Sequence, residues 1–157
     1  MLLWVIAFEQ YELGHVKGAS HDTSRTVRTS YELPEYVALA KSAYKDWQHL
    51  EEASKQKLLT ITGSVVLLPK AGPGAPAFDE WTNSIPTARQ WAEGLDANNL
   101  PYELLDHEAA NRRWPQFSLK EDMTANRSAK TGIVHAGKSV AAIQFLARLH
   151  GTEMKEH

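Results

Sequence analysis

The feature that most constrains the fold is an apolar run, residues 2–8, that ends at the acidic residue Glu9. The run shows no alternation of polar and apolar side chains, which is typical of a strand covered on both faces in a parallel sheet. A loop marked by Gly14, Gly18 and Ser20 follows the run. Because parallel strands are joined by crossover helices, this opening predicts an α/β fold.

Glu9 is the first candidate for a binding role. A carboxylate at the end of a buried strand is costly to desolvate unless it is hydrogen-bonded, and a nucleotide ribose offers two hydroxyl donors. In dinucleotide-binding βαβ units such an acid follows a glycine-rich phosphate loop by about 20 residues. No G-x-G-x-x-G precedes Glu9 in this sequence. Glu9 is therefore either a ribose ligand or a solvent-exposed acid at a strand end.

The first half of the remaining chain contains two helical patterns on either side of a β-rich stretch. Pro34 opens an amphipathic helix that runs to about residue 52, and residues 58–68 are β-rich around Gly63. A Pro/Gly-rich loop occupies residues 69–76. A helical region at 78–98 is divided near residues 84–86, where we expect Ser84 to cap a second piece. The predicted packing face of that piece is Ala88, Trp91, Ala92 and Leu95.

The second half predicts strands at residues 102–105, 123–128 and 132–136. Asp106 can cap a short helix that Trp114-Pro115 must end, because a residue before proline is pushed out of the α region. A final helix is expected from residue 139 to 150, with Gly151 as its stop, and residues 153–157 begin one more strand. The predicted packing face of the final helix is Val140, Ile143, Leu146 and Ala147.

Composition excludes several classes of protein. The 157 residues suit one ordinary domain, and 43% hydrophobic with 23% charged residues is typical of a soluble globular chain. A net charge of −2 gives no reason to expect nucleic acid or an anionic membrane as a partner. There are no cysteines and no paired histidines at ligand spacing, so we expect neither a disulfide scaffold nor a metal site.

Three basic residues near the first loop are candidates for chemistry. Guanidinium groups such as those of Arg25 and Arg28 suit carboxylates, because a planar fork donates two parallel hydrogen bonds. The two share a face only if their segment is helical, and in a strand they would serve different partners. His21 could act in proton transfer. Surface salt bridges for the arginines, and an exposed loop position for His21, are the alternatives.

Several short segments come in a consistent order along nearly the whole chain, and together they carry a family resemblance. The chain resembles the flavin-dependent amine and amino-acid oxidases of the D-amino-acid-oxidase superfamily, and most closely the sarcosine oxidase and N-methyl-tryptophan oxidase group. The matching segments are Phe8-Glu9-Gln10, Gly18-Ala19-Ser20-His21, Ser24-Arg25-Thr26-Val27-Arg28, Tyr36-Val37, Thr62-Gly63, Leu104-Leu105-Asp106, Arg113-Trp114-Pro115 and Gly132-Ile133.

The resemblance implies a cofactor, FAD, and a role for each candidate residue. Glu9 would bind the adenosine ribose, while Gly18, Ser20, His21, Ser24 and Arg25 would contribute to the cofactor site. His21, Arg25 and Arg28 would form the catalytic set, with Arg28 pairing with the carboxylate of a small amino-acid-like amine. The implied reaction is oxidation of a secondary amine to an imine, with oxygen consumed and peroxide released.

The resemblance also implies how the chain is divided into regions, and whether it can bind FAD and be active by itself. We expect residues 1–52 and 132–157 to be a partial FAD-binding Rossmann-like region, and residues 53–131 to be part of a β-containing substrate region. Without the glycine loop, which we expect in the DNA upstream of Met1, the chain alone should not retain FAD or turn over.

The alternative is a non-catalytic regulatory protein that self-associates, or pairs with a homologous subunit, through an exposed sheet edge. Relatives of this kind are cytoplasmic in bacteria and often peroxisomal in eukaryotes. The C-terminal residues Lys155-Glu156-His157 form no peroxisomal address.

Overall fold

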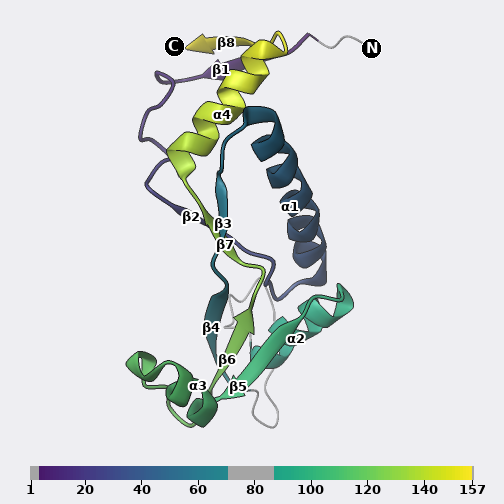
Figure 1. The fold of residues 1–157 in the computed structure, drawn as a ribbon, viewed down its shortest axis with the longest axis vertical. Helices are drawn as coiled ribbons and strands as arrows, with labels where there is room; N and C mark the ends of the chain where they lie inside the picture. Colours follow the sequence, from purple (N-terminus) through teal and green to yellow (C-terminus); the bar gives the residue numbers. More distant parts are fainter. Residues whose placement is uncertain (1–3, 71–86, 157) are drawn as a thin grey trace. The chain divides into compact units, whose positions relative to one another are not determined.

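The computed structural model describes residues 4–70 and 87–156, and this part of the chain folds into helices and sheets in two compact units. The first unit combines the described residues of 1–27, 44–60 and 133–157. The second combines those of 28–43 and 61–132. The protein is therefore a mixed α/β chain, as the sequence predicts, and each unit is built from segments that are distant in sequence (Figure 1).

The second unit is organised around an antiparallel sheet. Its strands are β4 (Ser64–Pro69), β6 (Met123–Ser128) and β5 (Tyr102–Asp106), with β6 in the middle. The register places Ser128 between Ser64 and Tyr102. All three strands are predicted by their sequence, and these predictions are confirmed.

Helices cover both faces of this sheet. On one face Trp91 of α2 (Ala88–Ala97) packs with Leu68 and Val66 of β4. On the other face Ala110 of α3 (His107–Arg113) packs with Ala125 of β6. A third cluster joins the start of α1 (Pro34–Ser54) to α2 through the fully buried side chains of Val37 and Leu95. The second unit therefore has a closed apolar core.

The helix ends in the second unit follow local capping chemistry. Thr87 caps α2 in a capping box with Gln90, and all four residues of the predicted packing face are buried. Ser84, the predicted cap, lies outside the described residues, and the described helix begins three residues later than that prediction. Asp106 accepts the backbone N–H of Ala109 and caps α3, which ends before Trp114 as predicted. A short 3-10 helix, Pro115–Phe117, follows.

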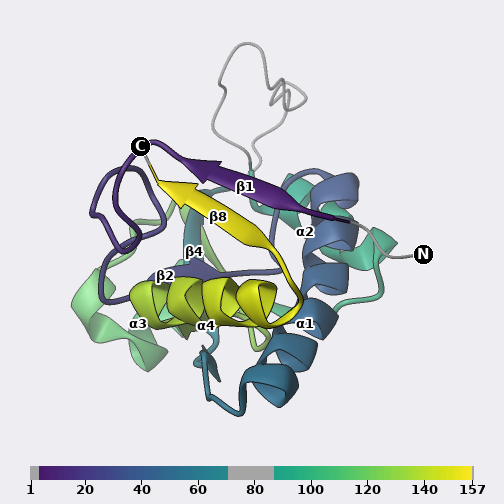
Figure 2. The same ribbon diagram turned by 90° about the horizontal axis from the view of Figure 1, so that it is seen from above.

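The first unit contains a parallel pair of strands. β1 (Ile6–Glu9) pairs with β8 (Glu153–Glu156), and the two lie side by side in both views (Figure 2). A second, three-stranded sheet has the order β2 (Arg25–Val27), β7 (Gly132–Val134), β3 (Leu59–Ile61) and belongs mainly to this unit. The helix α4 (Ala136–Leu149) connects β7 to β8, and Gly151, which follows its C-cap His150, has φ +84°.

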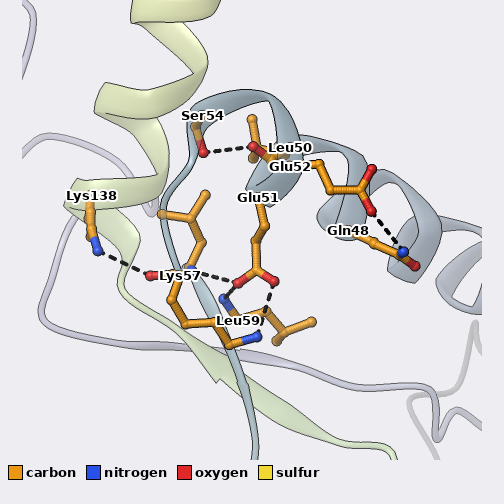
Figure 3. Close-up of polar contacts among 9 residues, drawn as sticks. Gln48, Leu50, Glu51, Glu52, Ser54, Lys57, Leu59 and Lys138 are labelled. Carbon is orange, nitrogen blue, oxygen red and sulfur yellow. Dashed lines mark hydrogen bonds and ion pairs between the residues drawn. The ribbon is translucent and has the colours of Figure 1, made fainter.

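Polar contacts of Glu51 fix the end of α1 against the start of β3 (Figure 3). Its carboxylate accepts the backbone N–H groups of Leu58 at 2.6 Å and Leu59 at 2.8 Å. The Lys57 ammonium lies 3.1 Å from the same carboxylate, and Lys138 of α4 donates to the Lys57 carbonyl at 3.1 Å. One carboxylate therefore ties together the helix end and the connection that follows it.

Two predictions for the first unit are wrong. The β1 side chains are not covered on both faces: Phe8 is 81% exposed and Ile6 is 47% exposed. In the described residues β1 pairs with β8 alone, and a two-stranded sheet has no central strand to bury. The α4 helix begins at Ala136 rather than Ser139, because His135 caps it. Its buried residues are Ala136, Ser139 and Ala142, while Ile143 of the predicted face is half exposed.

Candidate functional site

A cavity of about 400 Å³ lies in the first unit, where the loop after β1 approaches α4. Its walls are Glu9, the loop from Leu13 to Asp22, and residues on the first turns of α4, among them Gly137 and Val140. The volume falls within the range of small-ligand and cofactor pockets, about 300–1,000 Å³. Its position matches the general rule that ligands of parallel sheets bind beyond the carboxyl ends of the strands.

The Glu9 carboxylate stands at the edge of this cavity and is held by two neighbours. Its Oε1 accepts the Tyr11 backbone N–H at 3.0 Å, and its Oε2 lies 3.3 Å from Nε2 of His15. These hydrogen bonds, that of Tyr11 first, lower the pKa of Glu9, so the group is an ionised acceptor at neutral pH. A carboxylate has about four acceptor positions, so further hydrogen bonds can be accepted from a ligand.

Two glycines shape the loop that forms the cavity wall. Gly14 has φ +88° and Gly18 has φ +76°, conformations that other residues rarely adopt. A Cβ added at either position would meet nothing within 4 Å. These glycines are therefore required for the path of the backbone rather than for close packing, and they leave backbone groups open beside the cavity.

A second cavity of about 230 Å³ lies in the same unit and shares Ala19, Ser20 and Val140 with the first. Arg25 and Trp47 line it together with Val134, Ala136, Ser139 and Ile143. The backbone at residues 19–20 therefore contributes to both spaces, which places Ser20 beside each of them. An extended ligand in the first unit would have polar contacts near Glu9 and an aromatic wall at Trp47.

The structure brings together most of the predicted site residues. Glu9, Gly18, Ser20 and His21 all line the first cavity, and Ser20 and Arg25 line the second. Arg25 Nε donates to the His21 carbonyl at 3.2 Å, and the Arg25 guanidinium lies 3.7 Å from Asp22. Ser24 is exposed and lines neither cavity.

Arg28 belongs to the second unit and has different neighbours from Arg25. Its guanidinium lies over the Tyr31 ring at 4.4 Å and over the Trp91 ring at 5.3 Å. Residues 25–27 form a strand, so the alternative in which the two arginines serve different partners is the correct one. Stacking between aromatic rings limits the orientations of the Arg28 guanidinium.

Sequence reasoning missed several residues of the cavities. His15 and Leu13 line the first cavity, and Trp47 and Ser139 line the second. The position of His15 between two loop glycines was an available signal, whereas Trp47 lies on a helix where core packing is the more common use. Among the described residues, no group of three or more His, Cys, Asp or Glu side chains could hold a metal ion.

Comparison with known proteins identifies the family. The model of the family described as FAD dependent oxidoreductase (DAO) matches residues 3–157. The chain belongs to this FAD-dependent oxidoreductase family. Among curated members it is 31% identical to a monomeric sarcosine oxidase of Streptomyces avermitilis, over 96% of this chain and 36% of that protein. It is 28% identical to the peroxisomal sarcosine oxidase of Mus musculus, over 94% of this chain and 35% of that protein.

Solved structures show the same fold. The open form of NikD, an amino acid oxidase essential for nikkomycin biosynthesis, has a TM-score of 0.74 at 20% identity, covering 98% of this chain and 37% of NikD. The L-proline dehydrogenase of P. horikoshii has a TM-score of 0.65 at 18% identity, covering 97% of this chain and 37% of its own. The chain thus spans about a third of the length of the relatives it matches.

The residues of the first cavity fit the adenosine half of FAD. Glu9 is an ionised acceptor with acceptor positions left over, which suits the two hydroxyl donors of a ribose. The open backbone at Gly14 and Gly18 allows a ligand to approach the loop closely. Charge and shape in this cavity therefore agree with the cofactor that defines the family.

Proposed function

We propose that this chain supplies the ribose-binding and flavin-facing residues of an oxidase that acts on a secondary amine or an N-methyl amino acid such as sarcosine. With O2 and water, such a substrate yields the demethylated amine, an aldehyde formed from the imine, and H2O2. The observation that carries the proposal is the ionised Glu9 carboxylate at the end of β1, beside a cavity of about 400 Å³. The curated relatives named sarcosine oxidase support the choice of substrate class.

The proposed roles follow the positions of the side chains. Glu9 accepts the ribose hydroxyls, while the loop at Gly18 and Ser20 bounds the space for the rest of the nucleotide. His21 and Arg25 would lie beside the flavin, with Arg25 oriented by its hydrogen bond to the His21 carbonyl. Ser24 lines neither cavity, so its place beside the flavin is proposed from the family resemblance alone. When bound, FAD supplies the hydride acceptor for the carbon next to the amine nitrogen.

Arg28 is proposed to bind the substrate carboxylate. In the described structure its charge is contacted by the rings of Tyr31 and Trp91, which leave the donors at the guanidinium edge for a carboxylate. Adding sarcosine should therefore shift the backbone amide NMR signals of residues 28–31, while dimethylamine, which lacks the carboxylate, should not. Arg28→Gln should abolish the response, and Arg112→Gln, an exposed change on α3, should preserve it. Equal responses to both amines would contradict this role.

We propose that residues 1–52 and 132–157 form the nucleotide-binding region and that residues 53–131 contribute to the substrate region. Because this sequence contains no G-x-G-x-x-G loop to donate backbone N–H groups to the pyrophosphate, the 157 residues alone should bind FAD weakly and be inactive. After mixing with FAD and gel filtration, the protein peak should lack the visible absorbance of a bound flavin. It should also release no peroxide with sarcosine. A retained flavin spectrum would contradict weak binding.

Exposed apolar side chains in the first unit favour a second candidate function, a non-catalytic interaction protein. Trp4 and Phe8 near β1, and Phe145 and Leu149 on α4, are all more than half exposed. Unpaired strand edges and apolar patches are typical of association surfaces. This candidate predicts a defined dimer, or a complex with a homologous full-length subunit, in gel filtration with light scattering. A stable monomer with no affinity for such a subunit would count against it.

The location proposed for the protein is the cytoplasm or the peroxisome. The mouse and human relatives carry the name peroxisomal sarcosine oxidase. No helix in the described part of the chain is both long and apolar enough to cross a bilayer. Microscopy of the tagged protein in its own cells tests this proposal, and a signal from a secretory compartment would contradict it.

A further inference from the structure

Two carboxylates lie next to each other at the carboxyl edge of the parallel sheet. Glu9 ends β1 and Glu156 ends β8, and the register pairs these two residues directly. Like charges on neighbouring strands repel each other unless other groups compensate them. The structure provides that compensation from the loop that follows β1.

Each carboxylate accepts a backbone N–H from this loop. The Tyr11 N–H donates to Oε1 of Glu9 at 3.0 Å, and the Leu13 N–H donates to Oε1 of Glu156 at 2.5 Å. Hydrogen bonds to an ionised carboxylate are about twice as strong as those between neutral groups. The segment from Tyr11 to Leu13 is thus held at two points across the ends of both strands.

The point held by Glu156 is where the cavity wall begins. Leu13 and the residues after it line the first cavity, whereas Glu156 does not. The chain turns immediately afterwards at Gly14, whose φ is +88°. The next residue is His15, whose Nε2 lies 3.3 Å from Oε2 of Glu9. The loop therefore contacts the Glu9 carboxylate again directly after the turn at Gly14. The position of the Leu13 N–H therefore sets the start of the wall from Gly14 to Gly18.

We propose that Glu156 is a positioning residue of the nucleotide cavity. It holds the Leu13 N–H and so shapes the loop while keeping that donor away from Glu9. Without it, the unpaired Leu13 N–H would compete for the acceptor positions of Glu9 that a ribose would use. This inference rests on the proposed function of the cavity, but the contact on which it depends can be tested without any cofactor.

The first test measures amide hydrogen exchange by NMR in the 157-residue chain. Losing a hydrogen bond to a charged acceptor should raise the exchange rate of the Leu13 amide about tenfold in Glu156→Ala. Glu156→Gln keeps an acceptor oxygen and should restore most of the protection. Glu153→Ala is the matched control, because it removes the same charge from the same strand, where Glu153 pairs with Lys155. Unchanged Leu13 exchange in Glu156→Ala would overturn the proposal.

The second test follows ADP binding through the amide signals of residues 13–22. Glu156→Ala should weaken binding about five- to tenfold, Glu156→Gln should bind nearly as well as the original chain, and Glu153→Ala should not differ from it. Glu9→Ala, which removes the acceptor oxygens altogether, distinguishes failure of the Glu156 role from failure of the site. If Glu9→Ala weakens ADP binding and Glu156→Ala does not, only the role of Glu156 fails. If the original chain shows no response to millimolar ADP, or Glu9→Ala has no effect, the nucleotide site itself fails, and with it the role of Glu156.

Discussion

In the second unit Val37 and Leu95 are fully buried, and three apolar clusters surround the antiparallel sheet. In the first unit Leu58, Leu59 and Val134 are buried, but Phe8 and Phe145 are largely exposed, and the carboxylates of Glu51 and Glu156 link segments that are distant in sequence. Large apolar side chains of β1 and α4 therefore stay exposed in the first unit within the described structure, whereas α2 of the second unit buries its apolar face. Substitutions should therefore act through packing in the second unit and through hydrogen bonds in the first.

The largest effect is expected from Leu95→Ala. This side chain is fully buried against Val37 and Leu100, so its loss should lower the free energy of unfolding by about 3 kcal/mol. Phe145→Ala in the first unit removes a larger side chain that is 57% exposed, and it should change stability by less than about 0.5 kcal/mol. Urea denaturation measures both. Equal losses in the two variants would show that the first unit is packed as tightly as the second.

Much of this contrast could be predicted from sequence where local chemistry decides the structure. The cap at Asp106, the end of α3 before Trp114 and the buried face of α2 all follow from residues a few positions apart. The exposure of β1 could not be predicted in this way. An apolar run shows that a strand can be buried. Whether it is buried depends on helices and strands from other parts of the fold, and the sequence of the run itself does not specify those.

The residues of the candidate site also fall into two groups, those that local sequence predicts and those that only the tertiary fold brings together. Glu9 and the loop to His21 could be predicted, because a strand end followed by glycines has a recognisable spacing. Trp47 and Ser139 line the second cavity but belong to helices distant in sequence, and only the tertiary fold brings them to Arg25. Glu156 was missed for the same reason, since its partner Leu13 lies 143 positions earlier.

A second comparison uses one glycine from a helix in each unit. In α2 a Cβ at Gly94 would lie 2.7 Å from the Tyr31 carbonyl oxygen, so Gly94→Ala should cost about 2 kcal/mol through the forced backbone shift. In α4 a Cβ at Gly137 would meet nothing within 4 Å, so Gly137→Ala, in the first turn of the helix, should stabilise the protein by up to about 0.5 kcal/mol through helix propensity. Thermal unfolding followed by circular dichroism should give shifts of opposite sign. A lower melting temperature for both would contradict an open surface at α4.

Polar linkage in the first unit is tested by Glu51→Ala. The change leaves the backbone N–H groups of Leu58 and Leu59 without their acceptor and should cost about 1.5 kcal/mol. Glu52→Ala is the control, because the Glu52 carboxylate accepts a hydrogen bond from the exposed Gln48 side chain (Figure 3), and its loss should cost less than about 0.5 kcal/mol. Similar urea midpoints for the two variants would show that the Glu51 contacts do not stabilise the connection between α1 and β3.

The same carboxylate predicts a pH dependence. Burial acts to raise the pKa of Glu51, but the N–H groups of Leu59 and Leu58 and the Lys57 ammonium together hold it below its ordinary value of 4.5. A lowered pKa in the folded state stabilises the protein above the unfolded pKa, and this contribution is lost as the pH falls through the folded value. The stability difference between the original chain and Glu51→Ala should thus be constant from pH 8 to about 5 and shrink below about 4.5. A difference that grows on acidification would contradict a lowered pKa.

The smallest effect compares the caps of the two helices, one in each unit. Thr87 accepts the Gln90 N–H at 3.5 Å and also donates its own N–H to the Gln90 side chain at 2.7 Å, a reciprocal capping box. His135 accepts the Lys138 N–H at a similar 3.4 Å but has no reciprocal hydrogen bond from the Lys138 side chain, which donates to the Lys57 carbonyl instead. Thr87→Ala should therefore cost about 1 kcal/mol and His135→Ala less than half of that, measured by urea denaturation. A larger loss for His135→Ala would mean that α4 depends on its first turn more than α2 does, which is the reverse of what the second, reciprocal hydrogen bond of the Thr87 cap implies.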